Sequence, residues 1–302
     1  MDTGICARAL AALIAGVGAM LLSLPTAAGD AAGPLGRDLR LDVLCDDFER
    51  EDWAFDPAAN SDTQGYWTGS YRGAPRRLER VVPPAGGLEG SRGALSLRTE
   101  GDTDAHPNQD DLINRDYTSR LGRTLTRADR PVFMARIWMP PFEEWTPGAA
   151  NVGFRHEARS QQMVGPGNSV GYYYPSIWLR HMPAGDDATE AGPRWYLRIG
   201  TGVAPDEDAG PIPHAGWWTL ALAFDEDGVG HYYARPGVGP LAPEHRIWDT
   251  TRFRPAEGMN PQMDSVAYGF FSLGYPADGR LTPPFILDDY EVWIVGQEPG
   301  GR

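Results

Sequence analysis

The segment 217–235 constrains the fold more than any other part of the chain. Its first half alternates between large apolar residues and smaller or polar ones, and the large residues are Trp218, Leu220, Leu222 and Phe224. A period of two places one such set on a single face of a β-strand. Glu226-Asp227-Gly228 then predicts a turn, because glycine readily adopts the positive φ at which a chain reverses. The segment therefore predicts an antiparallel hairpin whose second strand begins at His231.

Most of the remaining chain shows the same kind of pattern, with short apolar or alternating runs between turn-forming residues. Stretches rich in glycine and proline, such as 165–168 and 183–193, separate these runs. The best helix candidate is short, at 118–129, and the chain has no internal repeat. We therefore predict an all-β chain that folds as a two-sheet antiparallel β-sandwich, or jelly roll. The further strands are expected at 43–48, 94–98, 132–139, 151–159, 172–181, 195–199, 265–273 and 285–295.

The N-terminus has the composition of a secretory signal peptide. Arg8 precedes an apolar run from Ala9 to Leu24, and small residues follow. A membrane anchor is the alternative, but the run of about 16 residues is shorter than the roughly 20 that a spanning helix needs. We expect a secreted or periplasmic protein with no membrane span after cleavage. The expected organisation is a signal peptide at 1–28, a linker at 29–41, one sandwich domain at 42–296 and a tail at 297–302.

The charge of the chain excludes several classes of function. The formal net charge is −14, which disfavours nucleic acid or anionic lipid as a partner because phosphate binding needs a basic surface. All 27 basic residues are arginines. Without lysine, neither Schiff-base catalysis nor a P-loop is feasible. No spacing typical of a zinc site and no nucleophile elbow occurs, and we expect no organic cofactor.

Both ends of the expected domain carry a family resemblance. Cys45-Asp46-Asp47-Phe48-Glu49 opens it, Ile286-Leu287-Asp288-Asp289-Tyr290-Glu291-Val292-Trp293 closes it, and the hairpin lies between. This set resembles the concanavalin A-like lectin/glucanase superfamily, including its laminin-G-like jelly rolls. The resemblance implies two stacked antiparallel sheets, of which the concave one commonly binds a glycan. Fold alone does not fix function.

The same resemblance implies a structural calcium ion where the first and last strands meet. Asp288 corresponds to the acidic position that opens the closing strand in that superfamily. Asp47 and Glu49 would be partners from the opening strand, and Gly93 would supply a carbonyl oxygen. Oxygen ligands of this kind suit Ca²⁺. The alternative is that Asp288 ends a turn and faces solvent.

A second resemblance concerns one predicted strand. Arg155-x-Glu157-x-Arg159 looks like the Arg-x-Glu-x-Arg strand of jelly-roll alginate lyases, in which arginine neutralises a uronate carboxylate while histidine or tyrosine transfers protons. The Gln-x-His segment of those enzymes is absent. The segment that contains Tyr233 matches their Tyr-x-Lys-x-Gly strand only weakly, because it has no lysine. The residues that would act in such a reaction are Arg155, His156, Glu157, His181 and Tyr233.

Aromatic and arginine side chains suggest a sugar-binding surface. Alternation along the predicted strands allows one polar and aromatic set to line a single concave sheet, namely Arg136, Trp138, Tyr174, Trp178, Arg180, Tyr196 and Arg198, together with Tyr233. Such a groove would suit an anionic or neutral polysaccharide. The alternative is that these residues cover a solvated convex face.

These observations favour an exported protein that binds polysaccharide on the concave sheet of a jelly roll. One alternative is a polysaccharide lyase that cleaves uronate-containing glycans by β-elimination. Another is a structural or adhesive surface module without a sugar site. A retaining glycosidase is disfavoured, because the Glu-x-Asp-x-x-Glu strand of the related glucanases is absent and two placed carboxylates are required.

Overall fold

The computed structural model describes the greater part of the predicted domain. The described residues are 35, 40–56, 58–59, 64–65, 67–69, 77–98, 111–145, 150–164, 170–183, 191–198, 206–249, 262–274 and 282–295. The predicted signal peptide at 1–28 and tail at 297–302 lie outside these ranges. Within them, no helix is both long enough and apolar enough to cross a membrane.

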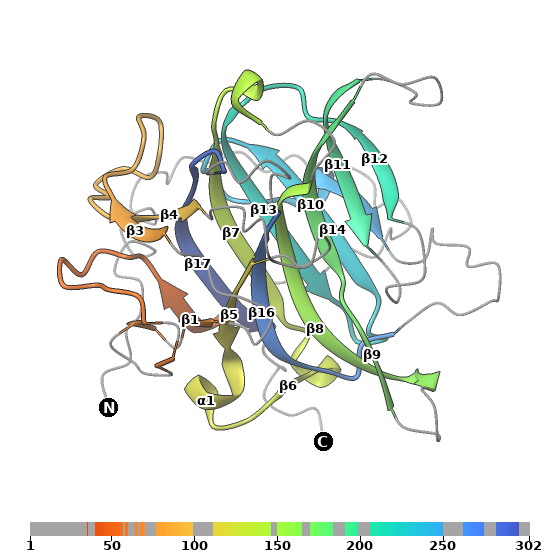
Figure 1. Ribbon diagram of the computed structural model, residues 1–302. Coiled ribbons are helices and arrows are strands. Elements are labelled where there is room, and N and C mark those ends of the chain that lie inside the picture. The colour runs from red at the N-terminus through yellow and green to blue at the C-terminus, as the bar shows by residue number, and fades with distance from the viewer. Residues whose placement is uncertain are drawn as a thin grey trace, which may run out of the picture.

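Two antiparallel sheets stack face to face to form the sandwich (Figure 1). We name each sheet after a central strand. The described part of the β7 sheet has eight strands: β15 (Arg246–Asp249), β14 (Gly230–Pro236), β13 (Gly216–Phe224), β7 (Val132–Met139), β17 (Phe285–Val295), β4 (Ala94–Arg98) and β3 (Arg77–Val81) in spatial order, with β1 (Arg40–Asp46) also paired to β17.

The described part of the β8 sheet has nine strands. In spatial order these are β12 (Glu207–Pro211), β11 (Gly192–Arg198), β10 (Ser176–Met182), β8 (Ala150–Val164), β16 (Ser265–Leu273), β5 (Asp111–Asp116) and β2 (Trp67–Gly69). In addition, β6 (Leu125–Thr126) pairs with β16, and β9 (Val170–Tyr173) pairs with β8. The predicted all-β class and two-sheet antiparallel sandwich are thus confirmed.

Helical structure in the described residues is confined to short elements. The predicted helix at 118–129 is wrong in its extent, because α1 covers only Tyr117–Leu121. Gly122 ends it in the left-handed conformation, with φ of 69°, which glycine adopts without strain. The remainder of that segment forms β6 and the 3₁₀ turn η4 (Arg127–Asp129); two further 3₁₀ turns are η5 (Phe142–Glu144) and η6 (Pro243–His245).

The central strands lie where alternation predicted them, and the hairpin forms as β13 and β14. The strand predicted at 172–181 is divided into β9 and β10. Pro175 lies at the break, because proline has no N–H to donate to the neighbouring strand. Short strands such as β2, β3, β5 and β15 were not predicted. They are three to six residues long, too short for alternation to be recognised against loop composition.

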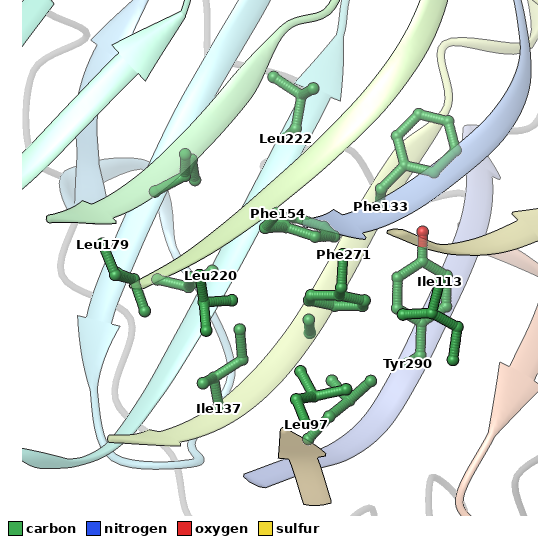
Figure 2. Close-up of a cluster of buried hydrophobic side chains, with 14 of the residues drawn as sticks. Leu97, Ile113, Phe133, Ile137, Phe154, Leu179, Leu220, Leu222, Phe271 and Tyr290 are labelled. Carbon is green, nitrogen blue, oxygen red and sulfur yellow. The ribbon is translucent and has the colours of Figure 1, made fainter. Parts of the chain in front are cut away.

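The main hydrophobic core fills the space between the sheets (Figure 2). Phe154 and Phe271 enter it from the β8 sheet, while Leu220, Leu222 and Leu287 enter it from the β7 sheet. Each of these side chains is at most 1% exposed. Full burial of such a side chain stabilises the fold by roughly 1.5–3 kcal/mol. Residues at the intervening positions therefore face outward from one sheet or the other.

The outer surface of the β7 sheet is partly apolar and covered. We name as the outer apolar cluster Val132, Met134, Ala221, Ala223, Tyr233 and Trp293. Leu35 and Leu241 pack against it. Leu35 lies in the predicted linker, and the last residues of that linker belong to β1. The chain ahead of residue 42 therefore contributes to the sandwich.

Candidate functional site

The outer surface of the β8 sheet differs from that of the β7 sheet because it gathers polar and aromatic side chains. Strand alternation explains this difference: apolar residues of β8, β10, β11 and β16 face the core, and the residues between them face outward. We name this surface the polar face. Its residues are Arg155, Glu157, Arg159, Tyr174, Trp178, Arg180, Arg194, Tyr196, Arg198, Tyr268 and Phe270.

Trp178 lies at the centre of the polar face and is 2% exposed. Three guanidinium groups surround its ring at 5.1 to 5.8 Å from the ring centroid, and they belong to Arg155, Arg180 and Arg198. A cation above an aromatic face is attracted by the ring quadrupole. The tryptophan thus holds three cationic side chains from three adjacent strands close together.

Arg155 is fixed by its neighbours. Its Nη1 donates to Ser272 Oγ at 2.8 Å, and its guanidinium carbon lies 5.4 Å from the ring centroid of Tyr174. The side chain is buried, at 7% exposure. A guanidinium held in this way keeps one orientation, so the entropy that it loses on binding a carboxylate is small.

Two aspartates from the edge of the sheet partly neutralise the arginines. Asp206 forms ion pairs with both Arg180 and Arg198, and its distance to Arg198 Nε is 2.7 Å. Asp208 accepts from Arg194 Nε at 2.7 Å. The Asp206 side chain is 6% exposed and that of Asp208 is 29% exposed. The pairs order the arginine side chains while leaving part of each accessible.

The other half of the polar face contains a carboxylate beside a tyrosine. Glu157 and Tyr268 are registered partners on β8 and β16. Burial raises the pKa of Glu157, although nearby Arg159 lowers it in part. Burial also raises the pKa of Tyr268, and the carboxylate of Asp116 adds to the effect. Both groups therefore hold their protons more tightly than they would in water.

The predicted catalytic residues do not come together. Arg155 and Glu157 lie on the polar face, but His156 points into the core with 0% exposure. Its ring centroid lies 4.2 Å from that of Phe133, and burial lowers its pKa well below the usual range. The structure thus contradicts its assignment as a residue that transfers protons beside Arg155, because strand alternation turns it away from Arg155 and into the core.

The two remaining predicted catalytic residues also lie away from Arg155. Tyr233 is buried in the outer apolar cluster of the opposite sheet. His181 follows Arg180 near the end of β10 and, by alternation, lies on the inner side of the strand with Leu179. Strand alternation places a residue on one face of its strand, but it does not say to which sheet that strand belongs.

The predicted ligand-binding set divides between the two sheets. Tyr174, Trp178, Arg180, Tyr196 and Arg198 belong to the polar face. The other members lie on the outside of the β7 sheet, so the prediction of one common surface is wrong. There, Arg136 forms ion pairs with Glu291 at 2.6 Å and Asp289 at 3.4 Å. Trp138 packs beside Trp217.

Several residues in or beside the polar face were not predicted. Tyr268, Phe270 and Ser272 lie on β16, where their alternation with apolar residues could have indicated an outward position. Asp206 and Asp208 lie at the edge of the sheet in a stretch with loop composition. No pattern in the sequence indicates that these aspartates meet Arg180, Arg194 and Arg198.

The residues predicted to bind calcium were tested for a fit to a metal ion. No group of three or more histidine, cysteine, aspartate or glutamate side chains in the described ranges is arranged to hold one. Glu49 Oε1 instead accepts from the backbone N–H of Arg92 at 2.8 Å, and Asp47 Oδ1 accepts from the N–H of Glu49 at 3.2 Å. Asp288 is fully buried on β17, and Gly93 precedes β4. Asp47 and Glu49 therefore accept local hydrogen bonds, and the predicted side chains are not arranged as a metal-binding group within the described residues.

Comparisons with known proteins concern the fold. No protein-family model matches the chain, and no curated protein matches it. Similar solved structures include the carbohydrate recognition domain of Emp47p, with 11% identity, a TM-score of 0.45, and coverage of 89% of this chain and 100% of that chain. The endo-β-1,4-glucuronan lyase from the fungus Trichoderma reesei has 11% identity, a TM-score of 0.44, and coverage of 83% and 95%.

A third similar structure is the exoplasmic/lumenal domain of VIP36 in its Ca²⁺/Man2-bound form. It has 9% identity, a TM-score of 0.44, and coverage of 81% of this chain and 87% of that chain. Likenesses at such identities and TM-scores say nothing of the function of this chain. The two stacked antiparallel sheets that the sequence resemblance implied are present in the structure.

Proposed function

We propose that this chain binds a polysaccharide through the polar face, and that the polysaccharide carries carboxylates. The observation that carries the proposal is the array of Arg155, Arg180 and Arg198 around Trp178. Guanidinium groups bind carboxylates through paired N–H donors, which makes arginine well suited to uronate residues.

The aromatic side chains of the polar face support a sugar ligand. Tyr174, Tyr196, Tyr268 and Phe270 are half-buried, so part of each side chain remains accessible. Aromatic rings contact the C–H surfaces of sugars, and tyrosine hydroxyls bond to sugar hydroxyls. On the outside of the β7 sheet, by contrast, Leu35 and Leu241 pack over the outer apolar cluster.

The distribution of charge supports an anionic ligand. The chain as a whole has a formal net charge of −14. The polar face nevertheless carries five arginines, Arg155, Arg159, Arg180, Arg194 and Arg198, beside the carboxylates of Glu157, Asp206 and Asp208. Such a local excess of positive charge in an acidic protein favours binding of an anion at this surface.

Calorimetric titration tests the proposal with a polyuronate and with a neutral polymer of similar linkage. We expect measurable binding of the polyuronate and an affinity at least tenfold lower for Arg155→Ala, because the variant loses a fixed guanidinium. Arg50→Ala is the matched control, since Arg50 is exposed and follows β1, a strand of the other sheet. Equal affinity of all three proteins would exclude the polar face as the binding surface.

β-Elimination of the same polymers is a second candidate function. The observation that favours it is the alignment of Arg155, Glu157 and Arg159 on one face beside Tyr268. The raised pKa of Tyr268 suits a group that donates a proton to the leaving oxygen. Ultraviolet absorbance of unsaturated uronate ends, recorded during the titrations, distinguishes the two functions. Binding with no rise in absorbance supports recognition alone.

We also propose that the chain is exported, because residues 1–28 have the composition of a signal peptide. N-terminal sequencing of the protein recovered from a bacterial periplasm or culture medium tests this. A mature protein that still begins at Met1 would contradict it.

A protein that binds no polysaccharide in any of these tests would leave the structural or adhesive role.

A further inference from the structure

Two chain segments meet beside β17 at the place where the family resemblance implied a calcium ion. One contains Phe48 and Glu49, just after β1, and the other contains Arg92 and Gly93, just before β4. β1 and β4 both pair with β17, over different parts of its length. Whatever holds these two segments together therefore fixes how the sheet closes at this end.

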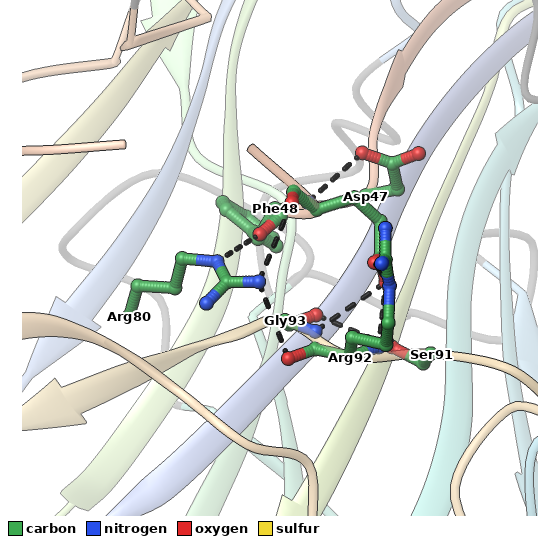
Figure 3. Close-up of polar contacts among 7 residues, drawn as sticks. Asp47, Phe48, Arg80, Ser91, Arg92 and Gly93 are labelled. Carbon is green, nitrogen blue, oxygen red and sulfur yellow. Dashed lines mark hydrogen bonds and ion pairs between the residues drawn. The ribbon is translucent and has the colours of Figure 1, made fainter. Parts of the chain in front are cut away.

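The guanidinium of Arg80 bonds to both segments (Figure 3). Its Nε donates to the carbonyl oxygen of Phe48 at 2.7 Å. Its Nη2 donates to the carbonyl oxygens of Glu49 at 3.3 Å and Arg92 at 3.2 Å. Three backbone oxygens from two segments thus converge on one cationic group, which is delivered from the adjacent strand β3.

The carboxylate of Glu49 beside this point is engaged by other donors. Besides the Arg92 N–H, Glu49 Oε1 accepts from the hydroxyl of Ser91 at 3.2 Å, and Glu49 Oε2 accepts from Arg92 Nε at 3.3 Å. Calcium takes six to eight oxygen ligands at about 2.3–2.6 Å. Here the convergent oxygens face hydrogen-bond donors at ordinary hydrogen-bond distances, which is the geometry of a guanidinium site and not of a metal cage.

Gly93 allows this close approach. A Cβ at position 93 would lie 2.1 Å from the carbonyl oxygen of Phe48 and 2.7 Å from Nε of Arg80. Both neighbours would have to move, and the backbone oxygen cannot move without shifting the segment after β1. A residue without a side chain is therefore required where the guanidinium meets the backbone.

We infer that the guanidinium of Arg80 takes the place of a structural calcium ion in this chain. The side chain of Arg80 on β3 supplies the positive charge that the carbonyl oxygens face, so the junction requires no metal. The inference is independent of the proposed function, because Arg80 lies on the β7 sheet and the polar face belongs to the β8 sheet.

Thermal unfolding of the purified chain tests the inference without any variant. We expect the Tm to change by less than about 1 °C when a chelator is added or when millimolar CaCl₂ is supplied after chelation. A calcium ion present at a hundred times its dissociation constant would instead raise the Tm by roughly 5–10 °C. A fall of that size with chelator, reversed by calcium, would overturn the inference.

Variants test the role of the guanidinium itself. Arg80→Ala removes three charge-assisted hydrogen bonds, and we expect its Tm to fall by about 5 °C or more. Arg80→Lys keeps the positive charge but loses the planar set of N–H donors of the guanidinium. Its Tm should therefore lie between those of Arg80→Ala and the original chain. Glu79→Ala is the matched control, because Glu79 is an exposed neighbour on β3. If Arg80→Ala has the same Tm as Glu79→Ala, the inference is wrong.

Discussion

Trp178 of β10 lies against Gly153 of β8, its registered partner in the sheet. A Cβ at position 153 would stand 2.6 Å from Cε3 and Cζ3 of the indole. Because glycine leaves that space open, the indole can lie against the neighbouring strand and support Arg155, Arg180 and Arg198 around it. The position of the arginine array therefore depends on a residue that has no side chain.

Gly153→Ala should displace Trp178 and lower the free energy of unfolding by about 1–3 kcal/mol, the usual cost of overpacking. Affinity for polyuronate should fall as well, because the arginines move with the indole. Urea unfolding and calorimetric titration measure the two effects. The double variant Gly153→Ala/Trp178→Leu should lose less stability than the sum of its single changes, since leucine makes room for the new methyl group. Full additivity would contradict the proposed contact.

The two aspartates at the edge of the β8 sheet provide a matched comparison. Asp206 is 6% exposed and pairs with two arginines, whereas Asp208 is 29% exposed and pairs with Arg194. We expect Asp206→Ala to lower the free energy of unfolding by about 1–2 kcal/mol, because two partly buried guanidiniums lose their partner. Asp208→Ala should cost less than about 1 kcal/mol, as more exposed pairs do. Urea unfolding of both variants in one buffer checks this order, and a larger loss for Asp208→Ala would contradict it.

The long central strands could be predicted from the sequence because burial imposes a regular pattern on them. Trp218, Leu220 and Phe224 alternate with smaller residues, and all three are in the core. Alternation also placed Trp178 and Arg180 on one side of their strand. These inferences need only local geometry, which a period of two supplies.

What the sequence does not contain is the assignment of strands to sheets. Arg136 and Arg180 both occupy outward positions, but they lie on opposite sides of the sandwich because β7 and β10 belong to different sheets. His156 was predicted to act with Arg155, although adjacent residues of one strand face opposite ways. The partners of Arg80 are backbone carbonyls, which any residue carries, so no residue pattern could reveal them.

Leu35 offers a test of where the folded domain begins. It packs against the outer apolar cluster, although it lies in the predicted linker. Leu35→Asp should lower the free energy of unfolding by about 1–2 kcal/mol, because a charge replaces partly buried apolar surface. Val82→Asp is the control, since Val82 is 78% exposed and its replacement should cost little. Equal stability of the two variants in urea would show that Leu35 adds nothing to the fold.

His156 should make the stability of the chain depend on pH. Burial lowers its pKa well below the usual value near 6.5, so the folded state keeps the imidazole neutral at pH values where the unfolded chain protonates it. The unfolded state then binds more protons, and stability falls as the pH falls below about 6.5. This one group should cost about 1.4 kcal/mol between pH 7.5 and 5.5.

Urea unfolding across that pH range, in the original chain and in His156→Gln, isolates the contribution of His156. The variant loses the contact between Nδ1 of His156 and the hydroxyl of Tyr117, so its absolute stability will be lower. The informative quantity is the change in the free energy of unfolding with pH. Between pH 7.5 and 5.5 this change should be smaller in His156→Gln by about 1.4 kcal/mol. If His156→Gln keeps the slope of the original chain, the imidazole is protonated in the folded state, and its burial in the core, which separates it from Arg155, must be wrong.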